Sequence, residues 1–169
     1  MNLNFKTITL ILLNLIILLS CNESDDPETE LLTFLCCKEN PFLSQNIDNL
    51  DQSNGEINVS PVFTPNGDGF YDRFGIENID LYSPNSVTLF NLNDEIVYST
   101  QDYSNFNNFL GGNDTNLESG TYKYKVVVEN EQTFLKFGYV CIVKTPEDGD
   151  GFSFSSECSL IDFFDPILR

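Results

Sequence analysis

Residues 120–143 read GTYKYKVVVENEQTFLKFGYVCIV and hold two runs of strand-forming residues around a polar turn. In the first run the even-numbered residues from Tyr122 to Val128 share one face of a strand, because side chains alternate along β structure. Residues 129–132 are acidic or carry amides, as turn residues often do. The pattern predicts a β-hairpin with strands at 120–129 and 133–144.

The returning run is apolar on both of its faces, which carry Leu135, Phe137, Tyr139 and Cys141 on one side and Val140 and Ile142 on the other. Such a strand is typical of a sheet that is covered on both sides, so we expect it at the centre, beneath a second sheet. Further strands are predicted at 57–63, 71–77, 86–91 and 95–99, with Asn93-Asp94 as a second hairpin turn. The predicted fold class is all-β, an immunoglobulin-like antiparallel β-sandwich of about seven strands.

A polar turn set between aromatic residues occupies residues 62–74, which read VFTPNGDGFYDRF. Asn66, Asp68 and Asp72 present side-chain oxygens at successive offsets of two and four, as the ligands of a calcium loop do. The match to such a loop is incomplete, because Tyr71 stands at the position of its sharp-turn glycine. Two interpretations stay open: a calcium site formed by these three residues, or a turn whose side chains bond to its own backbone.

Composition excludes several classes of function. The 169 residues carry a formal charge of −18, and removal of a leader containing Lys6 leaves 7 − 26 = −19. A chain so acidic has no basic patch with which to bind nucleic acid or anionic lipid headgroups. The chain has no histidine, so Ser-His-Asp, Cys-His and imidazole-zinc sites are excluded. With its carboxylates spread along solvated segments, the chain is not expected to be an enzyme or to need a cofactor other than the calcium considered above.

The N-terminal segment predicts export. Lys6 precedes an apolar run at residues 8–19, which is shorter than the ~20 residues of a membrane-spanning helix and fits a signal peptide. The run ends in Leu-Leu-Ser-Cys21, which resembles the lipobox of bacterial lipoproteins. The resemblance implies that residues 1–20 are removed and that Cys21 is acylated, giving a membrane contact through lipid alone. The alternative is an ordinary signal peptide followed by an incidental cysteine.

An acidic tether follows at residues 22–28. It resembles the surface-export signal of Bacteroidota lipoproteins, which implies a location on the outer membrane, exposed at the cell surface. The simpler interpretation is that the acids keep the tether extended and solvated.

Four cysteines remain after Cys21, namely Cys36, Cys37, Cys141 and Cys158. In an oxidising compartment an even number predicts two disulfides. Because neighbouring cysteines rarely bond to each other, we expect Cys36 and Cys37 to reach separately to Cys141 and Cys158, with the pairing left open. A zinc site of four thiolates is the rival interpretation, although the paired short spacings of such sites are missing.

The chain is therefore expected to have four parts: a signal peptide (1–20), a lipidated tether with a disulfide-held surface segment (21–56), a β-sandwich (57–144) and a C-terminal tail (145–169). Residues 38–56 are polar and are expected to cross the surface, with one helical turn at 47–50. The tail becomes apolar after residue 151, so it either lies back on the domain, held by Cys158, or presents an apolar patch to a partner.

Several motifs occur in a fixed order: FTPNGDG (63–69), Ile76, LYSPNSVTLFN (81–91), Val97-Tyr98, Gly111-Gly112, LESGTYKY (117–124) and GYV (138–140). Together they resemble the gliding-motility-associated C-terminal domain, the type B sorting domain of the type IX secretion system. The resemblance covers residues 57–144. It implies an immunoglobulin-like sandwich that is recognised by the outer-membrane translocon and its shuttle proteins, in surface proteins linked to gliding and adhesion.

Three positions depart from that family. Residues 92–94 replace its usual Arg-Trp-Gly and residues 109–111 its Trp-Asp-Gly, so we expect Phe106 and Phe109 to fill the lost volume. Residues 145–169 extend past the usual C-terminal end of the family's domain. Two interpretations stay open: the domain is an export signal that is removed, or it is itself the functional domain. The leading hypothesis is a non-catalytic binding or adaptor lipoprotein of type IX secretion and gliding, with a translocon component, a shuttle protein or a surface adhesin as its partner. The alternative is a calcium-stiffened adhesion module that binds carbohydrate or matrix.

Overall fold

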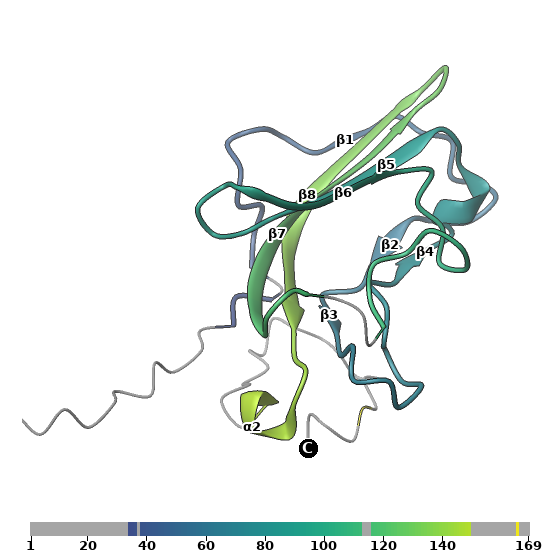
Figure 1. Ribbon diagram of the computed structural model, residues 1–169. Helices are drawn as coiled ribbons and strands as arrows, with labels where there is room; N and C mark the ends of the chain where they lie inside the picture. Colours follow the sequence, from purple (N-terminus) through teal and green to yellow (C-terminus); the bar gives the residue numbers. More distant parts are fainter. Residues whose placement is uncertain (1–33, 37, 113–115, 150–164, 166–169) are drawn as a thin grey trace, which may run out of the picture. The chain divides into compact units, whose positions relative to one another are not determined.

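The computed structural model describes residues 34–36, 38–112, 116–149 and 165. These residues contain eight strands, one 3-10 helix and one short α-helix (Figure 1): β1 (Ile47–Asp48), β2 (Asn58–Val59), β3 (Val62–Phe63), β4 (Ile76–Glu77), η1 (Ile79–Leu81), β5 (Asn85–Phe90), β6 (Ile96–Gln101), β7 (Gly120–Glu129), β8 (Thr133–Ile142) and α2 (Pro146–Gly149). The predicted all-β class is confirmed.

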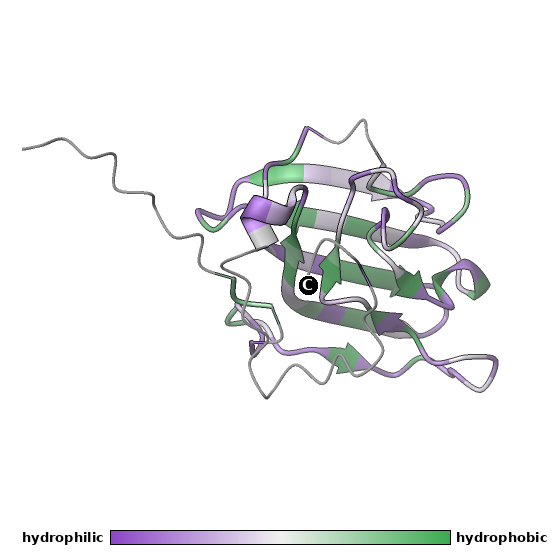
Figure 2. Ribbon diagram, turned by 90° about the horizontal axis from the view of Figure 1, so that it is seen from below, coloured by the Kyte–Doolittle hydropathy of each residue, from purple (hydrophilic) through white to green (hydrophobic). Residues whose placement is uncertain are grey.

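A six-stranded sheet dominates the structure. Its order is β1-β8-β7-β5-β6, and β3 pairs in parallel with the end of β8. All other pairs are antiparallel, including the hairpin of β7 and β8, whose register runs from Gly120 opposite Ile142 to Glu129 opposite Thr133. Strands β2 and β4 form a separate two-stranded sheet. In Figure 2, apolar and polar bands alternate along the long strands, as expected for side chains that point to opposite faces.

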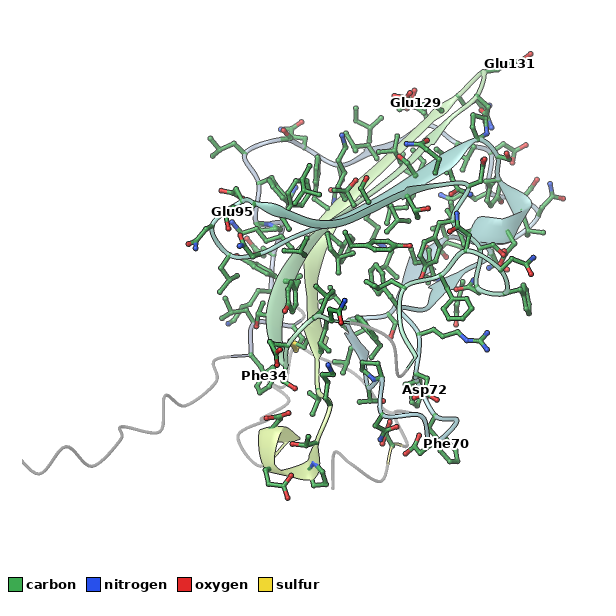
Figure 3. The ribbon with its side chains drawn as sticks, in the orientation of Figure 1. Phe34, Phe70, Asp72, Glu95, Glu129 and Glu131 are labelled. Atoms are coloured by element: carbon green, nitrogen blue, oxygen red, sulfur yellow. A yellow bond between two sulfur atoms is a disulfide. The ribbon has the colours of Figure 1, made fainter. Side chains whose placement is uncertain are left out.

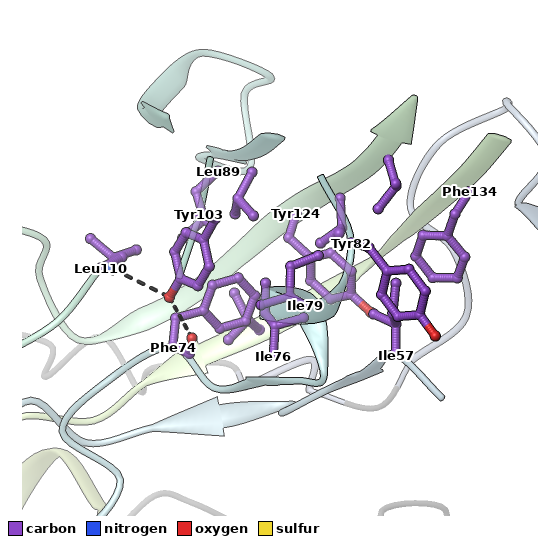
Figure 4. Packing of buried hydrophobic residues seen from close by; sticks show 14 of the residues in the cluster. Ile57, Phe74, Ile76, Ile79, Tyr82, Leu89, Tyr103, Leu110, Tyr124 and Phe134 are labelled. Atoms are coloured by element: carbon purple, nitrogen blue, oxygen red, sulfur yellow. Dashed lines mark hydrogen bonds between the residues drawn. The ribbon is translucent and has the colours of Figure 1, made fainter. Parts of the chain in front are cut away.

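The core lies between one face of the large sheet and the small sheet with its adjoining loops (Figure 4). The large sheet contributes fully buried residues such as Val126 and Val140. Opposite them pack Ile57, Phe74 and Ile76, which are also buried. The alternation in β7 is therefore what the hairpin pattern predicted, with its even-numbered residues inside.

The outer face of β8 is covered in a different way from the prediction of a second sheet. The ring of Phe42 lies 4.9 Å from that of Phe137 and 5.4 Å from that of Phe90. The side chain of Asn46 accepts a hydrogen bond from the backbone N–H of Phe137 at 2.9 Å, in the stretch of β8 between its pairings with β1 and β3. Residues 42–46, which have no regular secondary structure, thus cover part of the outer face. They do so through the aromatic contacts of Phe42 and the side-chain hydrogen bond of Asn46.

Candidate recognition site

The loop formed by residues 64–72 is flanked on both sides by residues that are buried in the core. Val62 and Phe63, which precede it, are fully buried in β3. Phe74, which follows it, is also fully buried, and its ring lies 5.7 Å from that of Phe63. The backbone N–H of Phe74 donates to the carbonyl of Leu110 at 2.8 Å. Both ends of the 64–72 loop are therefore fixed by packing, and its tip projects from a rigid base.

Asp72 organises the loop (Figure 3). Its Oδ1 accepts the N–H of Gly67 at 2.6 Å and its Oδ2 accepts the N–H of Gly69 at 2.9 Å. These glycines have φ of 81° and 94°, a region that glycine adopts without steric cost, so the chain can fold around the carboxylate. The backbone carbonyl of Asp72 accepts the N–H of Gly112 at 2.7 Å, which ties the loop to a second one.

Asn66 and Asp68 also bond to the loop itself. Asn66 Oδ1 accepts the N–H of Asp68 at 3.0 Å, and Asp68 Oδ1 accepts the N–H of Phe70 at 2.9 Å. Asp68 Oδ2 accepts a hydrogen bond from Asn66 Nδ2 at 3.1 Å. Every side-chain oxygen of the three residues predicted for calcium, counting those of Asp72, thus accepts an N–H. This arrangement favours the self-bonded turn.

Calcium binding at Asn66, Asp68 and Asp72 stays a prediction that solution experiments can test. Among the residues that the structure describes, no group of three or more His, Cys, Asp or Glu side chains is placed to hold a metal ion. A cation at the 64–72 loop would therefore need amide or backbone oxygens in addition to the carboxylates of Asp68 and Asp72, and it would compete with the N–H donors described above.

The first prediction concerns Asp72→Asn. The new amide would turn an N–H toward one of the two glycine N–H groups, so we expect a loss of about 1–3 kcal/mol in the free energy of unfolding, with the fold retained. Asp68→Asn is the matched control, because its Oδ1 can still accept the N–H of Phe70 and it loses only the bond from the exposed side-chain amide of Asn66, so we expect a smaller loss. Thermal melts with and without a chelator provide the measurement, and the wild-type melt should not respond to chelation. A sharp fall on chelation in the wild type that is absent in Asp68→Asn would instead establish a calcium site.

Gly111 explains how closely the two loops approach. A Cβ atom at this position would lie 2.1 Å from the carbonyl oxygen of Asp72 and 2.7 Å from Cα of Arg73. Its φ of 134° is also one that other residues rarely adopt. Gly111 therefore permits the hydrogen bond between the neighbouring Gly112 and Asp72.

The second prediction follows from that contact. Gly111→Ala must push two backbone segments apart, so we expect it to cost more than the roughly 1–3 kcal/mol typical of backbone strain alone. Gly112→Ala is the control, since its φ of 78° is also positive but no atom lies within 4 Å of the added carbon. Urea titrations of both variants provide the measurement. Equal losses in the two variants would contradict a role for the close approach at Gly111.

Tyr103 braces the base of the loop from the core side (Figure 4). Its hydroxyl donates to the carbonyl of Phe74 at 2.5 Å and accepts the N–H of Leu110 at 3.3 Å. Its side chain is almost fully buried, and burial raises the pKa of this hydroxyl well above its usual range. The hydroxyl therefore stays protonated and keeps donating under all ordinary conditions.

Aromatic side chains reach solvent at the tip. Phe70 is 51% exposed and Tyr71 is 38% exposed. Behind them, the guanidinium carbon of Arg73 lies 4.4 Å from the ring centre of Phe109. Phe109 packs against the core as the sequence predicts, but Phe106 is 73% exposed, so the prediction that it also replaces a lost tryptophan is wrong. An apolar tip beside acidic residues on a rigid base is suited to binding a protein surface.

Asp165, which is the described residue after position 149, contacts the 64–72 loop. The hydroxyl of Thr64, which is fully buried, donates to Oδ2 of Asp165, which is only 2% exposed. A carboxylate is buried at tolerable cost only when it is hydrogen-bonded, so this contact fixes Asp165 beneath the loop. Sequence reasoning missed Asp165, because it is one of several acids in the tail and nothing in the sequence indicates its distant partner.

Cys36 and Cys141 form a disulfide, with their Cα atoms 5.5 Å apart. This agrees with the expectation that Cys36 bonds to one of the two distant cysteines. The second expected bridge, which would then join Cys37 to Cys158, and the expected lipidation of Cys21 concern residues outside the described part of the chain. Among the described residues, none of the helices is long and apolar enough to cross a bilayer.

Comparison with known families identifies the domain that contains the two sheets. The family described as CHU_C Type IX secretion signal domain matches residues 57–142, which is more than half of the 169 residues. The matched range includes the 64–72 loop and ends at the last residue of β8. No curated protein and no solved structure gives a significant match.

Proposed function

Since the chain belongs to the family of type IX secretion signal domains, we propose that it is a cell-surface lipoprotein in which this domain is retained as a non-catalytic binding module. Membership implies export by the type IX system to the outer membrane or cell surface and contact with its machinery. A secretion signal domain is recognised by the secretion machinery and needs no catalytic activity. The proposal adds to this the lipid anchor, the retention of the domain and an adaptor role in type IX secretion and gliding.

The observation that carries the retention of the domain is the way its two ends are joined to flanking residues. The Cys36–Cys141 disulfide links a residue before the matched range to the last strand within it. On the other side, Asp165 lies buried against Thr64 of the 64–72 loop. After cleavage between Cys36 and the matched range, the disulfide would still join the two parts, and the burial of Asp165 adds a noncovalent contact on the other side. Both contacts favour a module that stays with its flanks.

The proposed anchor is Cys21. The sequence Leu-Leu-Ser-Cys21 offers a thiol after an apolar leader, and acyl chains on this thiol would supply membrane affinity. The acidic residues 22–28 would then hold the domain away from the membrane surface as a solvated tether.

The third prediction tests the anchor. Cys21→Ser should release the protein from the membrane fraction, because firm attachment needs two or more acyl chains. Labelling of cells with a palmitate analogue, followed by membrane fractionation, provides the measurement, and Cys158→Ser is the matched control that should keep its label. A wild-type protein that fractionates with membranes without taking up the label would contradict the proposal.

Protease shaving of whole cells separates the secretion role from an adhesion role. If a type IX component delivers the protein, surface exposure should be lost in cells that lack the translocon, and the protein should co-purify with a translocon component, a shuttle protein or a surface adhesin. Glycan or matrix binding by the purified domain, with exposure unchanged in such cells, would favour the alternative of an adhesion module.

A further inference from the structure

Strand β6 lies at the edge of the large sheet, as the described residues have it. Among the described residues it pairs only with β5, at the end of the strand order. Its residues, IVYSTQ, contain no lysine, no proline and no charge, which are the usual devices that keep an edge strand from pairing with another chain. The strand is also rich in the residue types that favour β structure.

The hydrogen-bond pattern shows which backbone groups point outward. The N–H of Asp102 donates to the carbonyl of Asn85 at 2.8 Å, and hydrogen-bonded pairs alternate along an antiparallel ladder. The backbone N–H and C=O groups of Thr100 and Tyr98 therefore point toward β5, whereas those of Gln101 and Ser99 point away from it. The amide of Asn108 donates to the carbonyl of Gln101 at 2.6 Å, so the open part of the edge is centred on Ser99.

Apolar surface accompanies this open backbone. Ile96 is 64% exposed and Val97 is 36% exposed. Beside the strand lies a hollow of about 320 Å³, which Val97 lines together with Phe109 and Leu117. An added strand could thus place one side chain in the hollow while its backbone bonds to the edge.

Charges define what such a strand should carry. Glu95 and Asp102 stand immediately before and after β6, and both are exposed (Figure 3 labels Glu95). Two copies of β6 paired in antiparallel fashion would set Glu95 of each near Asp102 of the other, and like charges opposite each other are destabilising. The net charge of −18 adds to this repulsion. A partner with basic residues at both ends would meet complementary charge instead.

We propose that the β6 edge binds an extended segment of a partner protein, with alternating apolar side chains at its centre and Lys or Arg at each end, as an additional strand of the large sheet. The inference rests on the proposed binding role of the domain and names the chemistry of its partner. It is independent of the lipid anchor, so the experiment below can fail while the prediction for Cys21 holds.

The experiment uses the full chain purified in detergent and a fluorescein-labelled peptide, Lys-Val-Thr-Val-Thr-Val-Thr-Lys, with anisotropy as the readout. Ser99→Pro removes one outward N–H and leaves the ladder to β5 intact, so the Kd should rise about tenfold, the equivalent of one net hydrogen bond. Ser99→Ala is the matched control: both variants lose the contact between the Ser99 and Thr88 hydroxyls, but only alanine keeps the N–H. Its Kd should stay within about twofold of the wild type.

A second peptide with Glu in place of both Lys residues tests the charge. The Glu peptide should bind the wild type about tenfold more weakly than the Lys peptide. In the Glu95→Lys variant, the Kd values of the two peptides should lie closer together. The proposal is overturned if the Lys peptide does not bind at concentrations up to about 1 mM, if Ser99→Pro binds it as the wild type does, or if both peptides bind equally. A dimer in sedimentation that Ser99→Pro abolishes would overturn it as well, because the occupant of the edge would then be a second copy of the chain.

Discussion

Val140→Asp is expected to unfold the domain. Val140 is fully buried in β8 and faces the core between the two sheets. The substitution removes the burial of an apolar side chain, worth about 1.5–3 kcal/mol, and places a carboxyl group where water is excluded, at a cost of roughly 2–7 kcal/mol even without ionisation. Together these losses approach the roughly 5–15 kcal/mol that stabilise a typical small domain.

Thermal melts and protease shaving of whole cells measure the outcome. Val97→Asp is the matched control, because it makes the same chemical change at a residue that is 36% exposed on the edge strand. We expect the control to melt close to the wild type and Val140→Asp to show no cooperative transition and no surface display. A wild-type melt for Val140→Asp would mean that β8 is not buried as the structure has it.

Strands with a strong local pattern could be predicted from the sequence. The period of two in residues 120–129 and the polar turn after it placed β7, and β8 is shorter than predicted by two residues at its end. The hairpin of β5 and β6 followed from Asn93-Asp94, where Asp94 has a φ of 67°. In these cases neighbouring residues carry the information, so no distant contact was needed.

Short strands could not be predicted, because their partners lie far away in the sequence. Residues 57–63 were expected to form one strand, but β2 and β3 separate at Ser60-Pro61 and join different sheets. Of the strand expected at 71–77, only β4 forms. The helical turn expected at 47–50 is wrong, since Ile47 and Asp48 pair with β8 as β1. Tertiary pairing outweighs local preference when an element has two residues.

In the candidate site, too, contacts between nearby residues could be predicted from the sequence and contacts between distant segments could not. The sequence identified the 64–72 loop and grouped Asn66, Asp68 and Asp72, which the structure indeed brings together. It gave no indication that Gly111 meets the backbone of Asp72 or that Asp165 bonds to Thr64. Such contacts depend on the packing of distant segments, which residue spacing does not report.

Removal of the Cys36–Cys141 disulfide is expected to destabilise the domain strongly. The bridge joins residues 105 positions apart, so it strongly restricts the unfolded chain. Replacing both cysteines, as Cys36→Ala with Cys141→Ala, should lower the free energy of unfolding by about 2–5 kcal/mol. The slope of that free energy with urea should rise, because the unfolded state expands and exposes more surface.

The matched control is Cys37→Ala with Cys158→Ala, which leaves the Cys36–Cys141 bridge in place and should stay oxidised at Cys141. Urea titrations with and without reductant separate the effect of the covalent bridge from the effect of losing the two cysteine side chains. Reductant should lower the stability of the wild type strongly and that of the Cys36→Ala, Cys141→Ala variant much less. If that double variant has the wild-type midpoint and slope, the bridge does not hold the N-terminal segment on β8. The cover of Phe42 over Phe137 would then have to form by aromatic packing alone, and the attachment of the domain to its N-terminal flank would lose its covalent basis.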